Sequence, residues 1–599
     1  MPFDIAINSK QYTAERWETA QQGQLLRQEW EGGWLGGMGA WDLRDPRRYY
    51  VCDGFDASQH PYLRLRPRFT HNLTVAAFDL DKPVHKFVAS AGGTNYMFVL
   101  NDRRSIQVNL TTLAIGVTTD FGAGAVCGRP ALFGGEWYVG LGATVNAKKL
   151  TNVALNTWTD VGSPAVTARH FATRMQGATP QLVRAHSTNK VDVSADGADW
   201  SGADFAVGDT SLGISDLLTY RGFTVVVKPD TPWTFDQFNN AVPFETITDR
   251  SQVLDQFLGS NCAVADAYFY WPHLSGLWRF VSDQGRPIGP EAELDWINFE
   301  LDPDFLAFGS ASGLPWNYTQ GWNSVDVSGR WLYAMWSGSD RTSSLFYGYI
   351  EDDGSVQWHG VLYQSIINRV RCFVQAGALW VADEAGDTLR RIVLSFDGSL
   401  RGQIGVNRGA ASTTFRFWMP PWEIYGGKQC QLRRVSGVLE GWPAGNVAPL
   451  EMRVHRDFAA TPNAVGAAVN ASGFFERVFT PGTNDLARNV ILMGRIITTA
   501  GYAPTTSDPR ISKLAIEAAS PIIYKVQIDL RDQQGRLRGF RDARKQLRDL
   551  YGGLGVPVRG PGESQTFNGY VVGYQEEALE DGWRITLGIE RYDWVQAAS

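Results

Sequence analysis

The sequence predicts a mainly β protein, with a degenerate β-propeller of about seven blades, a β-sandwich and a small α+β C-terminal module. The 599 residues include 63 Gly, 22 Trp and 21 Tyr but only 8 Met, which is typical of many strands and turns. A phrase of small or polar residues, an aromatic residue and an apolar run recurs along much of the chain. After it, apolar and polar residues alternate as in half-exposed strands. A chain of this length is expected to contain several domains.

Residues 1–45 are expected to form an N-terminal aromatic, glycine-rich arm. Its segment AERWETAQQGQLLRQEW is compatible with a short helix, whereas EGGWLGGMGAW is too rich in glycine to form a core. Three tryptophans of the arm need an apolar surface: Trp30, Trp34 and Trp41. Either the arm docks on a neighbouring subunit or it folds back on its own domain. Because ordering flexible backbone costs about 1 to 2 kcal/mol per residue, we predict that these rings are interface residues.

Residues 46–405 are predicted to form the propeller. With one marker residue per phrase, successive gaps are 41, 45, 41, 55, 53 and 49 residues, the length of a four-stranded blade. The markers are Tyr96, Trp137, Leu182, Phe223, Trp278, Trp331 and Trp380. Their continuous apolar runs suit a buried inner strand covered by adjacent blades. The alternative is an elongated set of β-sandwiches with chance spacing.

Three Asp-Gly pairs mark hairpin turns inside the predicted propeller: Asp196-Gly197, Asp353-Gly354 and Asp397-Gly398. Two-residue hairpin turns favour this pair because both central residues need positive φ. The segments VSADGADW and LSFDGSL resemble the Asp-box turns of sialidase-like propellers, in which the Asp side chain closes a hairpin. The glycine comes one residue early and Asp199 replaces the usual threonine. The Phe/Tyr-Arg-Ile-Pro motif of sialidases is absent from the sequence, so the resemblance implies structure rather than sialidase chemistry.

The two following regions have different patterns. Residues 406–520 alternate as antiparallel strands do, for example in PLEMRVHRD, and predict a β-sandwich. Residues 521–599 predict a small α+β module with one amphipathic helix in GFRDARKQLRDLYGG, ended by Gly552, and a C-terminal hairpin through Asp581-Gly582.

The sequence gives little evidence of chemistry. Five cysteines are widely spaced and odd in number, which favours small core residues over disulfides or zinc ligands: Cys52, Cys127, Cys262, Cys372 and Cys430. Eight histidines show no metal-ligand spacing: His60, His71, His85, His170, His186, His273, His359 and His455. Nucleophile and phosphate-loop motifs are also missing from the sequence. We therefore predict no catalytic residue, no metal and no cofactor.

The net charge and the distribution of apolar residues bear on nucleic-acid binding, secretion and membrane insertion. A formal net charge of -7 argues against nucleic-acid binding, which needs a clustered basic surface. The segment MPFDIAINSKQYTAERWE lacks the basic and apolar regions of a signal peptide, and the sequence has no run of about eighteen apolar residues that could span a membrane.

The combination of parts resembles tailed-bacteriophage virion proteins. The stretches that carry this resemblance are VDVSADGADWSGADFAVGD with LTYRGFTVVVKPDTPWTFD, and the C-terminal GYVVGYQEEALEDGWRITLGIERYDW. The resemblance implies a non-enzymatic structural component of a tail or tail tip, located in the virion. Its partners would be other tail proteins and copies of itself in a symmetric ring. A virion protein that binds host-surface glycan is the first alternative, and a sialidase-like glycosidase is the second.

Overall fold

The computed structural model describes most of the chain. The described residues are 3–31, 37–38, 48–49, 51–53, 55–56, 62–65, 69, 71–75, 77–200, 202, 204–236, 239–244, 257, 259–265, 267–289, 321–337, 343–365, 369–384, 386–400, 413–419, 422–445, 447–457, 459, 462–480, 485–498, 509–531, 537–579 and 582–592.

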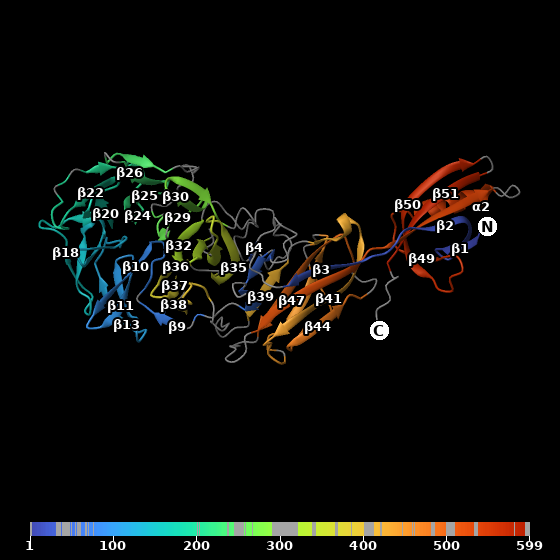
Figure 1. The fold of residues 1–599 in the computed structure, drawn as a ribbon, viewed down its shortest axis with the longest axis horizontal. Helices are drawn as coiled ribbons and strands as arrows, with labels where there is room; N and C mark the ends of the chain where they lie inside the picture. Colours follow the sequence, from blue (N-terminus) through green and yellow to red (C-terminus); the bar gives the residue numbers. More distant parts are fainter. Residues whose placement is uncertain are drawn as a thin grey trace.

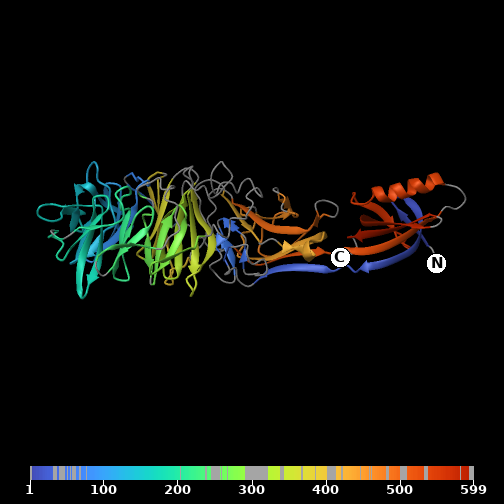
Figure 2. The ribbon, with the colours of Figure 1, turned by 90° about the horizontal axis from the view of Figure 1, so that it is seen from above.

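Three β structures lie in a row along the long axis of the molecule (Figure 1). A propeller lies at one end, a two-sheet sandwich lies in the middle, and a closed six-stranded barrel lies at the other end. The view from above shows the same order, with the orange-red coil of helix α2 (Leu537–Asp549) lying against the barrel (Figure 2). The molecule is therefore elongated.

In the described part of the chain, seven antiparallel blades form the propeller: six are separate four-stranded sheets, and blade 6 consists of the first four strands of a ten-stranded sheet that continues into the sandwich. Blade 1 consists of β10 (Val84–Ala91), β11 (Thr94–Asn101), β12 (Arg104–Asn109) and β13 (Ile115–Asp120), and blade 2 consists of β14 (Ala131–Phe133), β15 (Glu136–Val139), β17 (Lys148–Asn152) and β18 (Thr157–Asp160). Blade 3 consists of β20 (His170–Gln176), β21 (Thr179–His186), β22 (Lys190–Ser194) and β23 (Phe205–Ala206), and blade 4 consists of β24 (Asp216–Tyr220), β25 (Phe223–Val227), β26 (Pro232–Phe235) and β27 (Ala241–Pro243). Blade 5 consists of β28 (Ala263–Ala265), β29 (Tyr268–His273), β30 (Gly276–Val281) and β31 (Gln284–Pro287). Blade 6 consists of β32 (Trp322–Ser328), β33 (Trp331–Ser337), β34 (Ser343–Ile350) and β35 (Val356–Ser365). Blade 7 consists of β36 (Val370–Gln375), β37 (Ala378–Asp383), β38 (Thr388–Val393) and β9 (His71–Thr74). A two-stranded ribbon, β16 (Gly142–Asn146) with β19 (Thr167–Ala168), accompanies blade 2. The predicted count of about seven blades is confirmed.

The ring is closed by a strand from the other end of the propeller sequence. The fourth strand of blade 7 is β9, which precedes blade 1 in the chain and pairs antiparallel with β38. Leu73 lies opposite Leu389 in this pairing. One sheet therefore holds both ends of the propeller together.

The recurring phrase lies one strand away from its expected place. Six markers lie on second strands, in β11, β15, β21, β25, β33 and β37, and Trp278 lies on the third strand of blade 5. The first strands of blades 3 and 4, and of blades 6 and 7, contact each other around the axis. Phe223 is 63 % exposed because it stands beside the turn that opens β25. Each marker still occupies its own blade, which confirms the repeat.

The Asp-Gly turns are built differently from the prediction. Positive φ occurs at the glycine alone, at Gly197 (76°), Gly354 (76°) and Gly398 (80°). The aspartate closes the turn with its side chain instead. Asp196 Oδ1 accepts hydrogen bonds from the backbone N–H groups of Ala198 at 2.8 Å and Asp199 at 2.9 Å. This is the turn closure that the Asp-box resemblance implied.

The sandwich consists of two sheets with the largest apolar core between them. One sheet runs in the order β44 (Gly473–Val478), β41 (Cys430–Glu440), β47 (Arg510–Ala519), β8 (Leu63–Leu65) and β7 (Phe55–Asp56), with β3 (Leu25–Glu31) on β47 and β45 (Leu486–Ala487) on β41. The other runs β6 (Val51–Asp53), β39 (Thr413–Trp418), β46 (Asn489–Thr498), β42 (Leu450–Arg456) and β43 (Asn463–Ala464), with β40 (Trp422–Glu423) on β46 and the 3-10 turn η4 (Ile424–Gly427) beside it. A short parallel pair, β4 (Gly37–Met38) with β5 (Arg48–Tyr49), is separate. The predicted alternation holds on β42 from Leu450 to Val454, where Leu450, Met452 and Val454 are buried and the residues between them are partly exposed, but His455 is buried as well.

The barrel closes in the order β1 (Phe3–Ile7), β2 (Lys10–Gln21), β48 (Ile522–Arg531), β51 (Gly582–Arg591), β50 (Phe567–Leu579) and β49 (Val556–Arg559). Helix α2 (Leu537–Asp549) packs Leu547 into the barrel core. Gly552, predicted to end the helix, has a φ of 71°.

The predicted N-terminal helix is wrong, because AERWETAQQGQLLRQEW forms parts of two strands. β2 pairs with β48 of the barrel, and β3 pairs with β47 of the sandwich. Glu, Gln and Ala favour a helix locally, but the pairing of these segments with two distant strands overrides that preference.

The domain boundaries also differ from the predicted ones. The propeller strands run from His71 to Val393, and β6, β7 and β8 belong to the sandwich. Only residues 22–24 separate β2 from β3, and only residues 520–521 separate β47 from β48. At this junction the backbone N–H of Gln24 donates to Oγ of Ser520, and the backbone N–H of Ser520 donates to the carbonyl oxygen of Gln24, both at 2.9 Å. Two paired segments therefore cross together from the sandwich into the barrel.

Candidate functional site: the propeller axis

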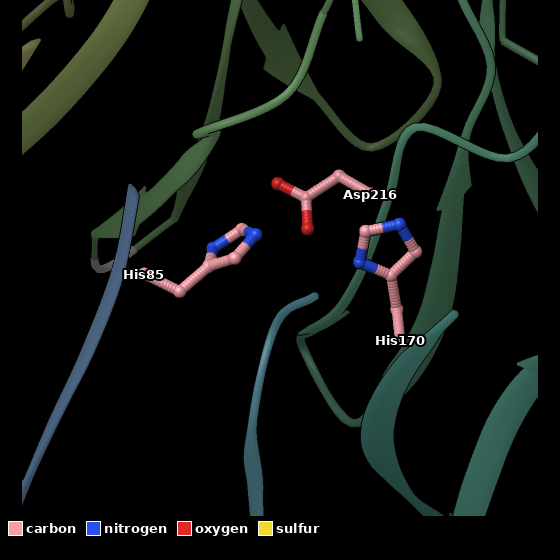
Figure 3. Close-up of side chains that lie close together, drawn as sticks. All are labelled: His85, His170 and Asp216. Carbon is pink, nitrogen blue, oxygen red and sulfur yellow. The ribbon is translucent and has the colours of Figure 1, made fainter. Parts of the chain in front are cut away.

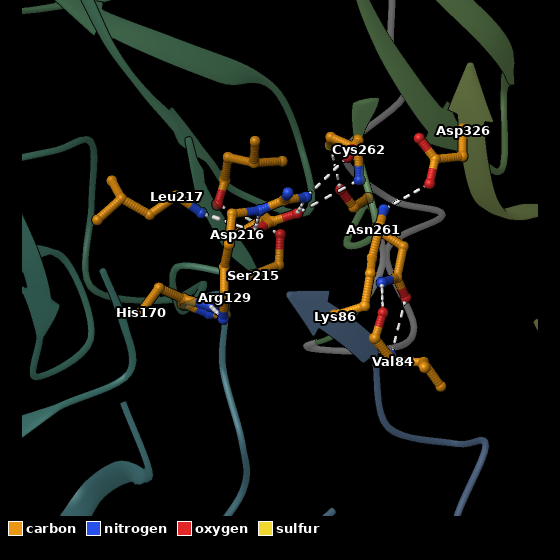
Figure 4. Close-up of polar contacts among 12 residues, drawn as sticks. Val84, Lys86, Arg129, His170, Ser215, Asp216, Leu217, Asn261, Cys262 and Asp326 are labelled. Atoms are coloured by element: carbon orange, nitrogen blue, oxygen red, sulfur yellow. Dashed lines mark hydrogen bonds and ion pairs between the residues drawn. The ribbon is translucent and has the colours of Figure 1, made fainter. Parts of the chain in front are cut away.

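Polar side chains gather where the first strands of the blades meet. They lie within or just before those strands, one or two to a blade, and we call them the axial cluster: His85, Lys86, Arg129, His170, Asp216, Asn261, Asp326 and Arg371. Figure 4 shows contacts of Lys86, Arg129, His170, Asp216, Asn261 and Asp326. Buried polar groups are stable only when they are paired, so their pairing indicates what the cluster does.

Asp216 and Arg129 form the ion pair of the cluster. Asp216 is the first residue of β24 and is fully buried, whereas the Arg129 side chain keeps 22 % exposure. Arg129 donates from Nε and Nη2 to the two carboxylate oxygens, each at 2.6 Å, and from Nη2 to the Cys262 carbonyl at 2.7 Å. Burial alone would raise the pKa of Asp216, but the Arg129 guanidinium outweighs it and holds that pKa well below its usual range. The pair links blades 2, 4 and 5.

Two histidines face this carboxylate. The rings of His85 on β10 and His170 on β20 point towards Asp216 (Figure 3). Nδ1 of His170 accepts the backbone N–H of Arg129 at 3.0 Å. Burial lowers the pKa of His170 to about 4 and lowers the pKa of His85 well below its usual value. Both rings are therefore neutral at pH 7.

His85 is a member of the axial cluster with a buried, unsatisfied hydrogen-bonding atom. Its side chain is only 2 % exposed, yet Nε2 has no hydrogen-bond partner among the described atoms. One ligand atom from each of His85, His170 and Asp216 lies within 4.8 Å of the others. These three residues are therefore the buried group that could hold a metal ion among the described residues.

The rest of the axial cluster ties blades together. Asn261 bonds the backbone of Val84 in both directions and accepts Nη1 of Arg371 at 3.0 Å. Lys86 of blade 1 pairs with Asp326 of blade 6, which also accepts the N–H of Val374 in blade 7 at 2.7 Å. These contacts are structural, because every named donor has a protein acceptor.

Two other groups have metal-ligand composition. His186, Asp192 and Asp204 lie on blade 3, where Arg184 and Lys190 already pair with the two carboxylates. Asp79, Asp81 and Glu384 lie between blades 7 and 1. In that group Glu384 accepts the N–H of Leu80 at 3.0 Å and Asp81 pairs with Arg369. Both groups are explained by these protein contacts.

Comparisons with known proteins give no family. No family model matches the chain. No curated protein matches it either. Among solved structures, the chain is similar to a streptogramin B lyase, with 9 % identity and a TM-score of 0.36 over 54 % of this chain and 97 % of that one. It is also similar to the RRP9 WD40 repeats, with 10 % identity and a TM-score of 0.38 over 55 % of this chain and 100 % of that one. A third similar structure is BamB from Moraxella catarrhalis, with 12 % identity and a TM-score of 0.32 over 59 % of this chain and 96 % of that one. Similarity at this level carries no argument about activity; the blade topology itself establishes the propeller.

The predicted interface residues have different outcomes. Trp30 is 2 % exposed, lies opposite Leu514 of β47 and packs in the sandwich core, so for this residue the arm folds back on its own domain. Trp34 and Trp41 lie outside the described residues, and their interface role stays a prediction. Cys127, Cys262, Cys372 and Cys430 are free and buried, as expected of core residues. Among the described residues, no helix is long and apolar enough to cross a membrane.

Sequence reasoning missed the axial cluster because its members come from different blades. Histidine spacing along the chain does not show that His85 and His170 converge. The signal that could have found them is the blade period itself. Arg129 and His170 are 41 residues apart, and Asp216 and Cys262 are 46 apart, so both spacings fall in the range of 41 to 55 residues that separates successive markers.

Proposed function

We propose that this chain is a structural, non-enzymatic component of a bacteriophage tail or tail tip, assembling with copies of itself and with neighbouring virion proteins. The observation that supports this most strongly is the doubled crossing between sandwich and barrel, where β2–β3 and β47–β48 run side by side. A single linker would allow the two parts to rotate, whereas two paired crossings resist bending. A stiff, elongated subunit suits a part that transmits force along a tail.

The junction between propeller and sandwich points the same way. The sheet of blade 6 continues into the sandwich through β35, which pairs in parallel with β6 at Val361 and Asp53. Backbone hydrogen bonding thus extends from the propeller into its neighbour. A continuous sheet joins the propeller to the sandwich, and two side-by-side crossings join the sandwich to the barrel, as expected of one mechanical unit.

The described residues do not place the acid that the glycosidase alternative needs in the propeller. A glycosidase needs a carboxyl group with a raised pKa beside an ionised carboxylate. Asp216 is held ionised by Arg129. Glu590 is the carboxyl group among the described residues whose pKa is raised, by burial, and it lies on β51 in the barrel, where Tyr592 donates to it. This arrangement favours a role without hydrolysis.

The test is the composition of purified particles. In a lysate that produces this chain, its peptides should co-sediment with tail proteins at a constant ratio through a density gradient. If the chain stays in the soluble fraction, the proposal is wrong. Particles that retain the chain at a peripheral site and bind a glycan array through it would instead support the receptor-binding alternative.

A variant pair separates interface from core within the same experiment. Trp34→Ala/Trp41→Ala should reduce incorporation into particles and leave the melting temperature of the isolated chain unchanged. Trp30→Ala is the matched control: it should lower the melting temperature, because it removes a buried ring. Normal incorporation of the double variant would contradict the predicted interface.

A further inference from the structure

The buried nitrogen of His85 needs a partner. Leaving a buried polar atom unsatisfied is costly, so such an atom in a folded protein calls for an occupant. Nε2 of His85 has no hydrogen-bond partner among the described atoms, and the ring is turned towards Asp216 and His170 (Figure 3). A water molecule or a cation could meet this need.

The surrounding atoms favour a cation. Two imidazole nitrogens and a carboxylate oxygen lie within 4.8 Å of one another. In a tetrahedral zinc site with bonds of about 2.0 to 2.1 Å, ligand atoms lie about 3.3 Å apart. Small rotations of the rings and the carboxylate would bring the three groups to that spacing, and a water molecule would take the fourth position.

The charges and lone pairs allow this. Both histidines are neutral, as metal ligands must be. A carboxylate has about four lone-pair sites, and Asp216 uses them for two bonds from Arg129 and for the N–H groups of Leu217 at 2.9 Å and Cys262 at 3.3 Å. An ion would take the place of the long bond from Cys262 and leave both bonds from Arg129. Arg129 balances the charge of Asp216, so a hydroxide at the fourth position would leave the site with a single positive charge. The hydrogen bond from the Arg129 N–H to Nδ1 of His170 competes with the ion.

We propose that His85, His170 and Asp216 form a binding site for a divalent transition-metal cation, best suited to Zn²⁺, which joins blades 1, 3 and 4 at the propeller axis. Imidazole nitrogen selects Zn²⁺ over Mg²⁺ and Ca²⁺, which prefer oxygen ligands. The site goes beyond the proposed tail function and does not depend on it.

The test uses the full chain without a histidine tag, dialysed against a chelator and then titrated with Zn²⁺, Co²⁺ or Mg²⁺. We expect one Zn²⁺ per chain by calorimetry, and Co²⁺ absorption bands of a low-symmetry site. The propeller melting temperature should rise by roughly 3 to 5 °C at about 100 times the Kd, and Mg²⁺ should have no effect.

His85→Phe keeps the ring volume and removes the ligand. Because Nε2 has no partner without an ion, this variant should melt close to the metal-free protein, lose more than about 100-fold in Zn²⁺ affinity and show no metal-dependent rise. His71→Phe, at an exposed position on β9, is the matched control and should bind Zn²⁺ normally. The proposal is overturned if the parent chain binds no Zn²⁺, which would leave water as the occupant, or if His85→Phe binds as the parent does.

Discussion

At the scale of single residues, the propeller axis depends on a charge that is stable only because it is paired. The Asp216 carboxylate is fully buried and is held by two charge-assisted hydrogen bonds from Arg129. Removing one member of a buried pair is far more damaging than removing both. The neutral state of His170 beside this pair has a similar origin, since burial penalises its protonated form.

Arg129→Met should therefore destabilise the propeller by about 3 to 5 kcal/mol, because it leaves a buried carboxylate unpaired. Arg129→Met/Asp216→Asn should recover part of that loss in urea unfolding followed by tryptophan fluorescence. Arg330→Met is the matched control, because Arg330 pairs with Asp352 at an exposed site and such pairs contribute little. A double variant no more stable than the single one would contradict this account.

The histidines make propeller stability depend on pH. The pKa of His170 falls from 6.5 in the unfolded chain to about 4 in the folded one, so below pH 6.5 the unfolded state binds a proton that the folded state does not. Stability should drop as pH falls from 6.5 to 4, by about 3 kcal/mol for this group, with no further loss from it below pH 4. His170→Gln should flatten the slope of melting temperature against pH in this window. An unchanged slope would mean that other groups carry the effect.

At the scale of elements, the feature that organises the molecule is the pairing of strands far apart in the chain. β9 completes a blade that begins at residue 370, and β1 and β2 complete a barrel whose other strands begin at residue 522. Without these strands, the sheets that they complete would have exposed, unpaired edges.

Local patterns explain which elements could be predicted. The alternation in β42, the apolar face of β48 and the end of α2 shortly before Gly552 are properties of a few adjacent residues. The number of blades could be predicted from the regular spacing of the marker residues, although the blades share no exact sequence motif. The pairing of β2 with β48 could not be predicted, because neither strand carries information about its partner. The meeting of His85, His170 and Asp216 was inaccessible for the same reason.

Deletion of residues 1–21 tests the barrel pairing. This change removes β1 and β2, so β48 loses its neighbour along most of its length and the barrel opens. Hydrogen exchange should show β48 amides losing protection, whereas β33 amides in the propeller keep theirs. If β48 remains protected, the barrel does not need these strands.

At the scale of the whole molecule, both junctions between the three folds are built from strands, so we expect the folds to move as one body. β35 with β6 joins the propeller to the sandwich, and the doubled crossing joins the sandwich to the barrel. Flexible domain motion is the usual expectation for chains of this length, and these junctions oppose it.

Small-angle scattering should detect the elongated shape. A globular chain of 599 residues would have a radius of gyration of about 25 Å. The radius here should be clearly larger, with a distance distribution skewed to long separations and unaffected by moderate changes in salt. A radius near that of a globule, or a distribution that broadens with salt, would contradict a stiff rod.

The return of β1–β3 to the far end of the chain also dictates the order in which the protein can fold during synthesis. β1 and β2 can pair with each other as soon as they are made, but β2 and β3 lack their partners β48 and β47 until residues 510–531 have been made, so they must wait while the propeller assembles. We predict that a nascent chain stalled with residue 440 outside the exit tunnel holds a protease-resistant propeller, while residues 3–31 are still cleaved. Release of the full chain should then protect them. Protection of those residues at the stalled stage would show that they find temporary partners.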